Sequence, residues 1–345
     1  MRKGEEMLKV TAKDIKGVVS MPPTPCKENA AGWNVENSID IEKSVMLVNA
    51  LLKSGVSAFA FCGTTGENAA LLWEEKKEYI ATTVRANNKR VPLFAGATSL
   101  GTKETIRQMR ALRDVGADGA FLGLPLWQTP TMENSIQWYA DLAEAVPDMS
   151  IMVYSNSMFF KSSFPTEFWE GLAKKAPTVV TNKIAYGIEN LADDVRVSGH
   201  QIKFVPGNLS ILEASKKTPG HCTANWTTGF APEPLVAVMD AFNKGDTARV
   251  DEIVKDIRSV TPETPRDGFG GDPNLKGWTR DMSRGFASYN AQVHKWSWNN
   301  SGYMDIGPMR APYRDLPDSW KATAATHAKE WMVMREKYVK VVTSR

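Results

Sequence analysis

Two periodicities of apolar residues alternate along the first two thirds of the chain. Short apolar runs rich in Val, Ile and Phe predict strands, and they are separated by stretches whose apolar residues recur every three or four positions, which predict amphipathic helices. The strand runs are continuously apolar, which is typical of strands covered on both faces. The predicted strands are 17–21, 57–62, 91–97, 117–123, 150–154, 179–183, 202–205 and 222–226, and the predicted helices are 41–53, 73–86, 102–115, 132–145, 165–175, 187–197 and 208–217.

This order of elements predicts an α/β fold of a particular kind. Strict alternation of strand and helix implies a parallel sheet with right-handed crossovers. Eight such units are the number found in a (β/α)8 TIM barrel. An open doubly wound sheet is the competing architecture, but it usually has fewer strands, and no GxGxxG sequence follows the first strand here. We therefore expect a (β/α)8 barrel.

The helical pattern continues after the last predicted strand. Residues 235–260, 279–300 and 318–340 have helical periodicity, and a Pro- and Gly-rich connection, 261–278, separates the first two. We expect an N-terminal arm over 1–16, the barrel over 17–245 and a C-terminal helical appendage over 246–345.

Composition narrows the class of protein. The chain has 345 residues, 42% of them hydrophobic and 23% charged, which excludes a disordered chain. The longest apolar runs are about eight residues, far below the roughly 20 of a membrane span. A net charge of +3 gives no electrostatic case for nucleic acid. Three cysteines without a CxxC pair, and a start without an apolar signal region, favour the cytoplasm.

Candidate catalytic residues are expected where the strands end, because barrel enzymes carry their sites at the carboxyl ends of the strands. Lys183 closes the apolar run that begins at Val179. Burial disfavours the charged form of a lysine, and the neutral amine is the nucleophile of Schiff-base chemistry. The alternative is a structural lysine that reaches solvent or pairs with a carboxylate.

Tyr154 and Asn156 end the preceding strand. Being two residues apart, they point to the same face, and adjacent strands would bring Tyr154 close enough to Lys183 to move protons there. The alternative is an ordinary core tyrosine.

Gly63, Thr64 and Thr65 follow the second strand, in the sequence Gly-Thr-Thr-Gly-Glu67. Consecutive N–H groups and two hydroxyls are suited to a carboxylate or phosphate, although a capped strand-to-helix turn has the same composition. We expect Glu67 to brace this loop. Amine, phenol and anion-binding loop together predict a site for a 2-keto acid. The four histidines show no metal-ligand spacing.

At these residues the sequence resembles the N-acetylneuraminate lyase/dihydrodipicolinate synthase superfamily of pyruvate-dependent class I aldolases. The resemblance covers roughly 15–240, and the tail more weakly. It implies that Lys183 forms the Schiff base, that Tyr154 is the acid/base with Thr64 as its relay, and that Thr65 holds the carboxylate. It also implies a homotetramer and a reaction without a metal or organic cofactor.

Within the superfamily the chain resembles the hydratase-aldolases of aromatic hydrocarbon breakdown. Trp127 stands where dihydrodipicolinate synthases carry a relay tyrosine, and an indole has no hydroxyl to pass a proton. The features shared with the hydratase-aldolases are Met21–Pro25, Leu72–Lys76, Pro125–Trp127, Asn156, Phe164–Pro165, Phe168–Trp169, Trp226 in Asn-Trp-Thr-Thr-Gly, and Gly307–Tyr313.

This subgroup acts on trans-benzylidenepyruvates such as the o-hydroxy and 2'-carboxy compounds. The resemblance implies that water adds to an aryl enone, followed by cleavage to an aromatic aldehyde and pyruvate. Asn156 would hold the water or the 4-hydroxyl, Trp127 and Trp226 would contact the aryl ring, and Asn290 would reach the site from the tail. A sugar-acid aldolase or dehydratase of the same superfamily, and a non-catalytic keto-acid-binding barrel, are the alternatives.

Overall fold

The structure is a computed structural model that describes residues 10–185, 187–207, 209–226, 230–265, 285–314 and 316–343. The chain forms two compact units. The barrel unit comprises Met1–Ser20, Ser57–Phe61 and Asn87–Trp226, and the helical unit comprises Met21–Val56, Cys62–Ala86 and Thr227–Arg345.

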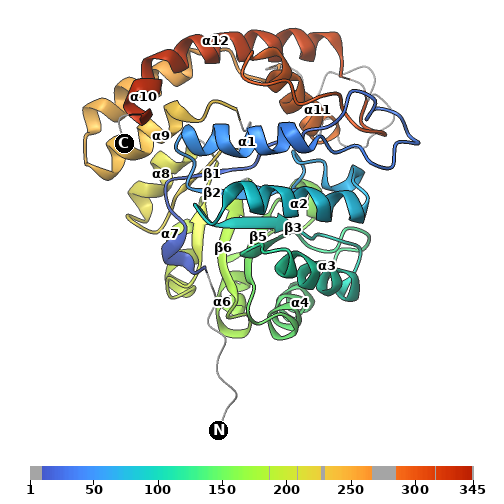
Figure 1. The fold of residues 1–345 in the computed structure, drawn as a ribbon. Coiled ribbons are helices and arrows are strands. Elements are labelled where there is room, and N and C mark those ends of the chain that lie inside the picture. Colours follow the sequence, from blue (N-terminus) through green and yellow to red (C-terminus); the bar gives the residue numbers. More distant parts are fainter. Residues whose placement is uncertain are drawn as a thin grey trace. The chain divides into compact units, whose positions relative to one another are not determined.

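Every strand of the described residues belongs to the barrel unit. Several of these strands are labelled in Figure 1. The strands are β1 (Val18–Ser20), β2 (Ala58–Phe61), β3 (Leu93–Gly96), β4 (Gly119–Leu122), β5 (Ser150–Ser155), β6 (Val179–Ile184), β7 (Lys203–Val205) and β8 (Ala224–Trp226). They form one eight-stranded sheet in the order β7-β6-β5-β4-β3-β2-β1-β8, and all neighbouring pairs are parallel. Parallel bridges Phe204–Cys222 and Gly207–Asn225 join β7 to β8 and close the sheet. The predicted TIM barrel is confirmed.

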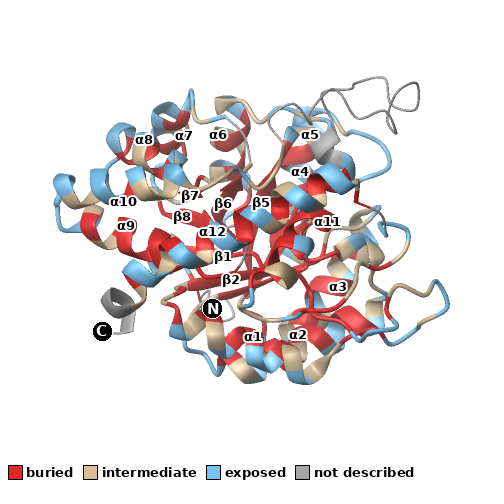
Figure 2. Ribbon diagram, turned by 90° about the horizontal axis from the view of Figure 1, so that it is seen from above, coloured by how far each residue is buried: buried red, intermediate tan, exposed pale blue. Residues whose placement is uncertain are grey.

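The strands form where the sequence is continuously apolar. All residues of β2, β3 and β4 are buried, and Figure 2 shows the strands largely in the red of buried residues. Such strands are stable only when side chains fill the barrel interior and helices cover the outside.

The helices of the barrel unit follow the predicted pattern. They are η1 (Ala12–Asp14), α3 (Thr102–Asp114), α4 (Met132–Ala145), α5 (Ser157–Phe160), α6 (Thr166–Lys175), α7 (Leu191–Val197) and α8 (Ser210–Lys217). In α4 the hydroxyl of Thr131 accepts from the backbone N of Asn134 (3.2 Å) and fixes the start of the helix. α7 begins four residues later than predicted, because Gly187 has a φ of +77° and the chain turns at 189–190 before the helix begins.

The helical unit contains the remaining elements. They are α1 (Ile41–Lys53), η2 (Asn68–Ala70), α2 (Trp73–Asn87, whose last residue falls in the barrel unit), α9 (Glu233–Asn243), α10 (Thr247–Ser259), α11 (Gly285–Asn300) and α12 (Asp318–Thr343). The helical stretch predicted over 235–260 is divided, because Gly245 has a φ of +72° and Asp246 caps a new helix by accepting from Arg249 N (3.0 Å). None of the helices described is long and apolar enough to pass through a membrane.

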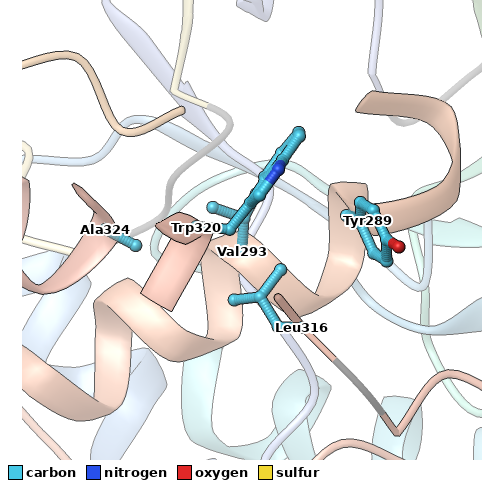
Figure 3. Close-up of a cluster of buried hydrophobic side chains, with 5 residues drawn as sticks. All are labelled: Tyr289, Val293, Leu316, Trp320 and Ala324. Atoms are coloured by element: carbon cyan, nitrogen blue, oxygen red, sulfur yellow. The ribbon is translucent and has the colours of Figure 1, made fainter. Parts of the chain in front are cut away.

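Aromatic residues form the core between α11 and α12. Figure 3 shows Tyr289 and Val293 on α11 facing Trp320 and Ala324 on α12, with Leu316 beside them. Tyr289 and Trp320 lie 5.2 Å apart between ring centroids. Further along α11, the fully buried Trp298 packs edge-on against Phe230. The tail therefore has an apolar core of its own.

Candidate active site

Tyr154 and Lys183 lie side by side at the carboxyl ends of β5 and β6. The two residues are register partners in the parallel pair. Both are buried, at 8% and 5% exposed, and the Lys183 amine lies 4.6 Å from the centre of the Tyr154 ring. The inward-facing alternation of the two strands brings the amine against the phenol.

The Lys183 amine is surrounded differently from an ordinary buried lysine. Among the residues that the structure describes, no carboxylate forms an ion pair with it. Its neighbour is an aromatic face, which attracts a cation more weakly than a carboxylate does. A carbonyl substrate would therefore meet an amine that is not engaged by a counterion.

Asn156 fixes the phenol oxygen of Tyr154. Its Oδ1 accepts from the backbone N of Met158 (3.0 Å) and of Phe159 (3.2 Å), which caps the short helix α5. With Oδ1 turned to these donors, the Nδ2 donates to the Tyr154 hydroxyl at 3.0 Å. The phenol oxygen thus accepts one bond from a buried amide, at 3% exposed.

Aromatic rings enclose Tyr154. Phe121 stacks on it at 5.0 Å between centroids, and Phe160 packs edge-on at 5.3 Å. Gly123 allows this approach, because a Cβ at this position would overlap the Phe160 ring. Sequence reasoning missed Phe121 and Gly123 as supports of the tyrosine.

Asn225 is a further supporting residue, to which sequence reasoning gave no role. It is fully buried in β8, and its Nδ2 donates to the backbone oxygens of Val205 (2.9 Å) and Ile184 (3.3 Å). It therefore ties β8 to β7 and β6 just beyond Lys183. A buried polar residue inside an apolar strand was the signal available in the sequence.

The two predicted tryptophans follow the carboxyl ends of β4 and β8. Trp127 lies in the segment between β4 and α4 and is 83% exposed. Trp226 ends β8, and its side chain lies outside what the structure describes, as do residues 227–229.

The predicted anion-binding loop, Gly63–Glu67, lies in the helical unit. It is folded by two nested turns, in which the N of Glu67 donates to Thr64 O (3.0 Å) and the N of Asn68 donates to Gly63 O (3.1 Å). Thr65 is buried at 9% exposed, and Thr64 is half-buried. Gly66 is required by sterics, because a Cβ there would lie 2.8 Å from the N of Cys62.

Glu67 is the buried end of this loop, at 3% exposed. Its carboxylate pairs with Lys295 of α11 (2.6 Å) and with the guanidinium of Arg310 (3.0 Å). The predicted bracing role is therefore carried by two cations that sequence reasoning did not single out.

Asn290 of α11 also lies in the helical unit, at 8% exposed. Within the part of the chain that the structure describes, its side chain has no hydrogen-bond partner. Four residues on, His294 bonds Glu263 through Nδ1 at 2.7 Å. Burial would raise the pKa of Glu263, but the charge and hydrogen bond of His294 outweigh it and lower that pKa to about 2.

Metal-binding side chains do not gather in the described residues: no group of three His, Cys, Asp or Glu is placed to hold an ion. The candidate residues divide between the units. The barrel unit carries Lys183, Tyr154, Asn156, Trp127 and Trp226, and the helical unit carries Gly63, Thr64, Thr65 and Asn290.

Sequence comparison places these residues among known proteins. Residues 22–266 match the model of the dihydrodipicolinate synthetase family. The chain is 34% identical over 337 residues to a trans-O-hydroxybenzylidenepyruvate hydratase-aldolase of Pseudomonas aeruginosa, with 96% of each chain covered. It is 30% identical over 337 residues to a trans-2'-carboxybenzalpyruvate hydratase-aldolase of Nocardioides sp. (strain KP7), with 96% of this chain and 97% of the relative covered.

Solved structures agree on the fold. The structure described as PhdJ bound to a substrate intermediate has a TM-score of 0.86 at 29% identity, and the match covers 96% of this chain and 100% of that one. A pyruvate complex of dihydrodipicolinate synthase from Acinetobacter baumannii has a TM-score of 0.74 at 22% identity, covering 92% and 99%, and shows the shared fold alone.

Proposed function

The chain belongs to the dihydrodipicolinate synthetase family, and from this premise we propose that it is a lyase, a Schiff-base hydratase-aldolase. Its substrate is a trans-benzylidenepyruvate, which it converts with water to an aromatic aldehyde and pyruvate. The relatives at 30–34% identity over nearly the full length are named for this activity. The observation that carries the proposal is the Lys183 amine against the phenol of Tyr154, whose oxygen is oriented by Asn156.

The reaction begins at the 2-keto group. The Lys183 amine attacks C2, and loss of water gives an iminium ion. Its positive charge withdraws electrons through the conjugated C3=C4 bond and makes C4 electrophilic. Water then adds to C4 and a proton to C3, which gives a 4-hydroxy adduct. Asn156, whose amide is fixed beside the phenol, is the residue that we assign to holding the water or the new hydroxyl.

Carbon–carbon cleavage uses the same iminium. Tyr154, with Thr64 as its relay, takes the proton of the 4-hydroxyl. The C3–C4 bond then breaks, its electron pair moves into an enamine on Lys183, and the aromatic aldehyde leaves. Protonation at C3 and hydrolysis release pyruvate. The covalent imine supplies the electron sink in both halves, so the reaction calls for no metal or organic cofactor.

The remaining predicted residues bind the substrate. Thr65 and the backbone of Gly63 receive the carboxylate through the turns described above. Trp127 and Trp226 contact the aryl ring, and Asn290 reaches the site from the tail. We further propose that the enzyme is a homotetramer in the cytoplasm and that it acts on no nucleic acid or membrane. We propose that the N-terminal arm ends at residue 16, that the barrel spans 17–245 and that the helical appendage spans 246–345.

Two measurements test this function. Borohydride with pyruvate should add a three-carbon fragment to Lys183, located by peptide mass. Enone absorbance of a hydroxy- or carboxy-benzylidenepyruvate should fall as aldehyde appears. Trapping without loss of enone would instead indicate a sugar-acid aldolase or dehydratase. Absence of trapping would leave only a keto-acid-binding barrel, and the proposal would fail.

Replacement of Trp127 by Leu tests the aryl contact. The indole is 83% exposed, so its loss removes contact area without opening a cavity. We expect KM for the aryl substrate to rise about tenfold, since burying an aromatic ring contributes roughly 1–2 kcal/mol. Half-saturation of trapping by pyruvate, which has no ring, should be unchanged. An equal rise for both compounds would contradict the assignment.

A further inference from the structure

The Gly63–Glu67 loop is held by charged residues that lie far from it in sequence. We propose that Glu67, Lys295 and Arg310, here called the loop clamp, are positioning residues that fix the loop in the conformation that binds the substrate carboxylate. This inference rests on the proposed function for the identity of the ligand. All residues of the clamp lie in the helical unit.

Glu67 connects the loop to the clamp. It has left-handed backbone geometry, with a φ of +56°, directly after Gly66. Its Oε1 accepts from Lys295 Nζ (2.6 Å) and Arg310 Nη1 (3.0 Å), and its Oε2 accepts from the backbone N of Arg310 (3.2 Å). The uncommon backbone conformation at Glu67 is therefore maintained by three donors on its side chain.

Arg310 holds the loop by a second route. Its Nη1 also donates to Thr24 O (3.2 Å), and its Nη2 donates to Pro25 O (3.3 Å). The hydroxyl of Thr24 in turn donates to Gly66 O at 2.7 Å. One guanidinium thus fixes both the carboxylate that ends the loop and the segment that binds the loop backbone.

Lys295 completes the clamp from α11. It is 1% exposed, and its Nζ has two acceptors besides Glu67, namely Thr24 O (3.4 Å) and Cys26 Sγ (3.3 Å). Burial raises the pKa of the Cys26 thiol, so this neighbour stays neutral and leaves Glu67 as the counterion of Lys295.

A second carboxylate extends the network to α2. Glu75 accepts from the N and the hydroxyl of Ser38 and from Leu72 N, and Arg310 Nε donates to the same Ser38 hydroxyl at 2.7 Å. Two buried carboxylates are thus joined to two buried cations. Since a buried charge is tolerated only with its partners in place, the network allows the loop few alternative positions.

The Gly63–Glu67 turn does not need the loop clamp in order to form. An exposed Gly-Thr-Thr-Gly turn closes with its own backbone bonds, as this one does. Burying four charges around it goes beyond that need. Preorganised donors bind an anion more tightly than mobile ones, because no ordering cost remains at the moment of binding. This is the property that the clamp supplies to Thr64 and Thr65.

The experiment compares Lys295→Met with a matched control, Arg335→Met. Arg335 pairs with Glu233 at 2.5 Å, with side chains 16% and 4% exposed, in the same unit but apart from the loop. Hydrogen exchange reports the amides of Glu67 and Asn68, which close the two turns. Borohydride trapping gives the pyruvate concentration at half-saturation and the rate at saturation.

We expect Lys295→Met to speed exchange of these amides about tenfold and to raise half-saturation about tenfold, with the saturated trapping rate nearly unchanged. Arg335→Met should change neither. If Lys295→Met does not fold, the charge-balanced double variant Glu67→Gln with Lys295→Met takes its place. Normal exchange or normal half-saturation in a folded clamp variant would overturn the inference. If the wild-type protein traps no pyruvate, the proposed function fails, and exchange alone decides whether the clamp fixes the loop.

Discussion

The two units treat a buried lysine in opposite ways. In the barrel unit, Lys183 is 5% exposed, faces the ring of Tyr154 and has no ion-pair partner among the described residues. In the helical unit, Lys295 is 1% exposed and contacts the carboxylate of Glu67 at 2.6 Å. A lysine paired with a carboxylate is held in place by that ion pair, whereas a lysine without a counterion leaves its nitrogen open to a carbonyl substrate. Burial alone therefore does not separate the lysine that we propose as the nucleophile from the lysine that holds structure, whereas the partners of each side chain do.

Buried carboxylates differ between the two units in the same way as the buried lysines, in whether a cation lies beside them. Asp194 of α7, in the barrel unit, accepts from the hydroxyl of Thr166 but has no cation beside it in the described structure, and burial raises its pKa to about 6. Glu263, in the helical unit, is more deeply buried, yet His294 lowers its pKa to about 2. In the helical unit the buried carboxylates Glu67 and Glu263 each have a cationic partner or a histidine beside them.

The largest expected effect comes from Lys183→Met. It should remove aldehyde release by on the order of 10⁴-fold or more, because the imine cannot form. Folding free energy should be unchanged or slightly improved, since a buried amine without a counterion is replaced by an apolar chain of similar length. Aldehyde release and urea unfolding measure the two quantities. If the variant releases aldehyde within tenfold of the wild-type rate, Lys183 is not the nucleophile and the contrast with Lys295 fails.

Lys295→Met should show the reverse pattern in stability. We expect a loss of about 3 kcal/mol in urea unfolding, at the lower end for breaking a buried pair, because Arg310 still contacts Glu67. The exposed pair Lys174–Glu170 provides the control, since Lys174→Met should cost less than about 1 kcal/mol. If Lys295→Met loses no more unfolding free energy than Lys174→Met, the Lys295–Glu67 pair stabilises the protein no more than an exposed ion pair does.

Glu263→Gln sharpens the comparison through pH. A carboxyl whose pKa falls from 4.5 to about 2 on folding stabilises the protein above pH 4.5, and this contribution is lost as the pH falls toward 2. The variant should therefore have a lower Tm than wild type at pH 7, and the gap should narrow in acid. A gap independent of pH would mean that packing alone is affected.

Asp194→Asn should give the smallest effect, with the opposite sign. A pKa raised from 3.8 to about 6 means that the stabilising contribution is present below pH 3.8 and is lost as the pH rises through 6. Removing the charge should raise Tm relative to wild type at pH 8 and change it less at pH 5. Thermal unfolding at the two pH values tests this, and a Tm that drops at pH 8 would contradict it.

The fold followed from the sequence because its signals are local. Most strands are short apolar runs, and the observed β2, Ala58–Phe61, lies within the predicted 57–62 and is one residue shorter at each end. Helix boundaries that depend on the backbone conformation of a glycine were harder to predict from the sequence. Gly245 divides a continuous helical pattern, and Gly187 delays α7, although neither glycine interrupts the apolar period.

The site was predictable only in part, because only some of its contacts follow from local sequence signals. Alternation along neighbouring strands is enough to bring Tyr154 to Lys183. The cations of Glu67 gave no such signal, because Lys295 lies on a helix of mixed polarity and Arg310 follows no regular pattern. Only tertiary packing makes these charges neighbours.

The distance between Glu67 and its last partner has a consequence during synthesis. Arg310 is 243 residues downstream, and at roughly 5–20 residues per second a ribosome needs about 12–50 s to reach it. Lys295 is 228 residues downstream, so for most of that time the Glu67 carboxylate has neither cation and must remain hydrated. The Gly-Thr-Thr-Gly turn therefore matures late in the life of the nascent chain. A translation product released before residue 295 would carry Lys183 and Tyr154 in its sequence without either cation of the loop clamp.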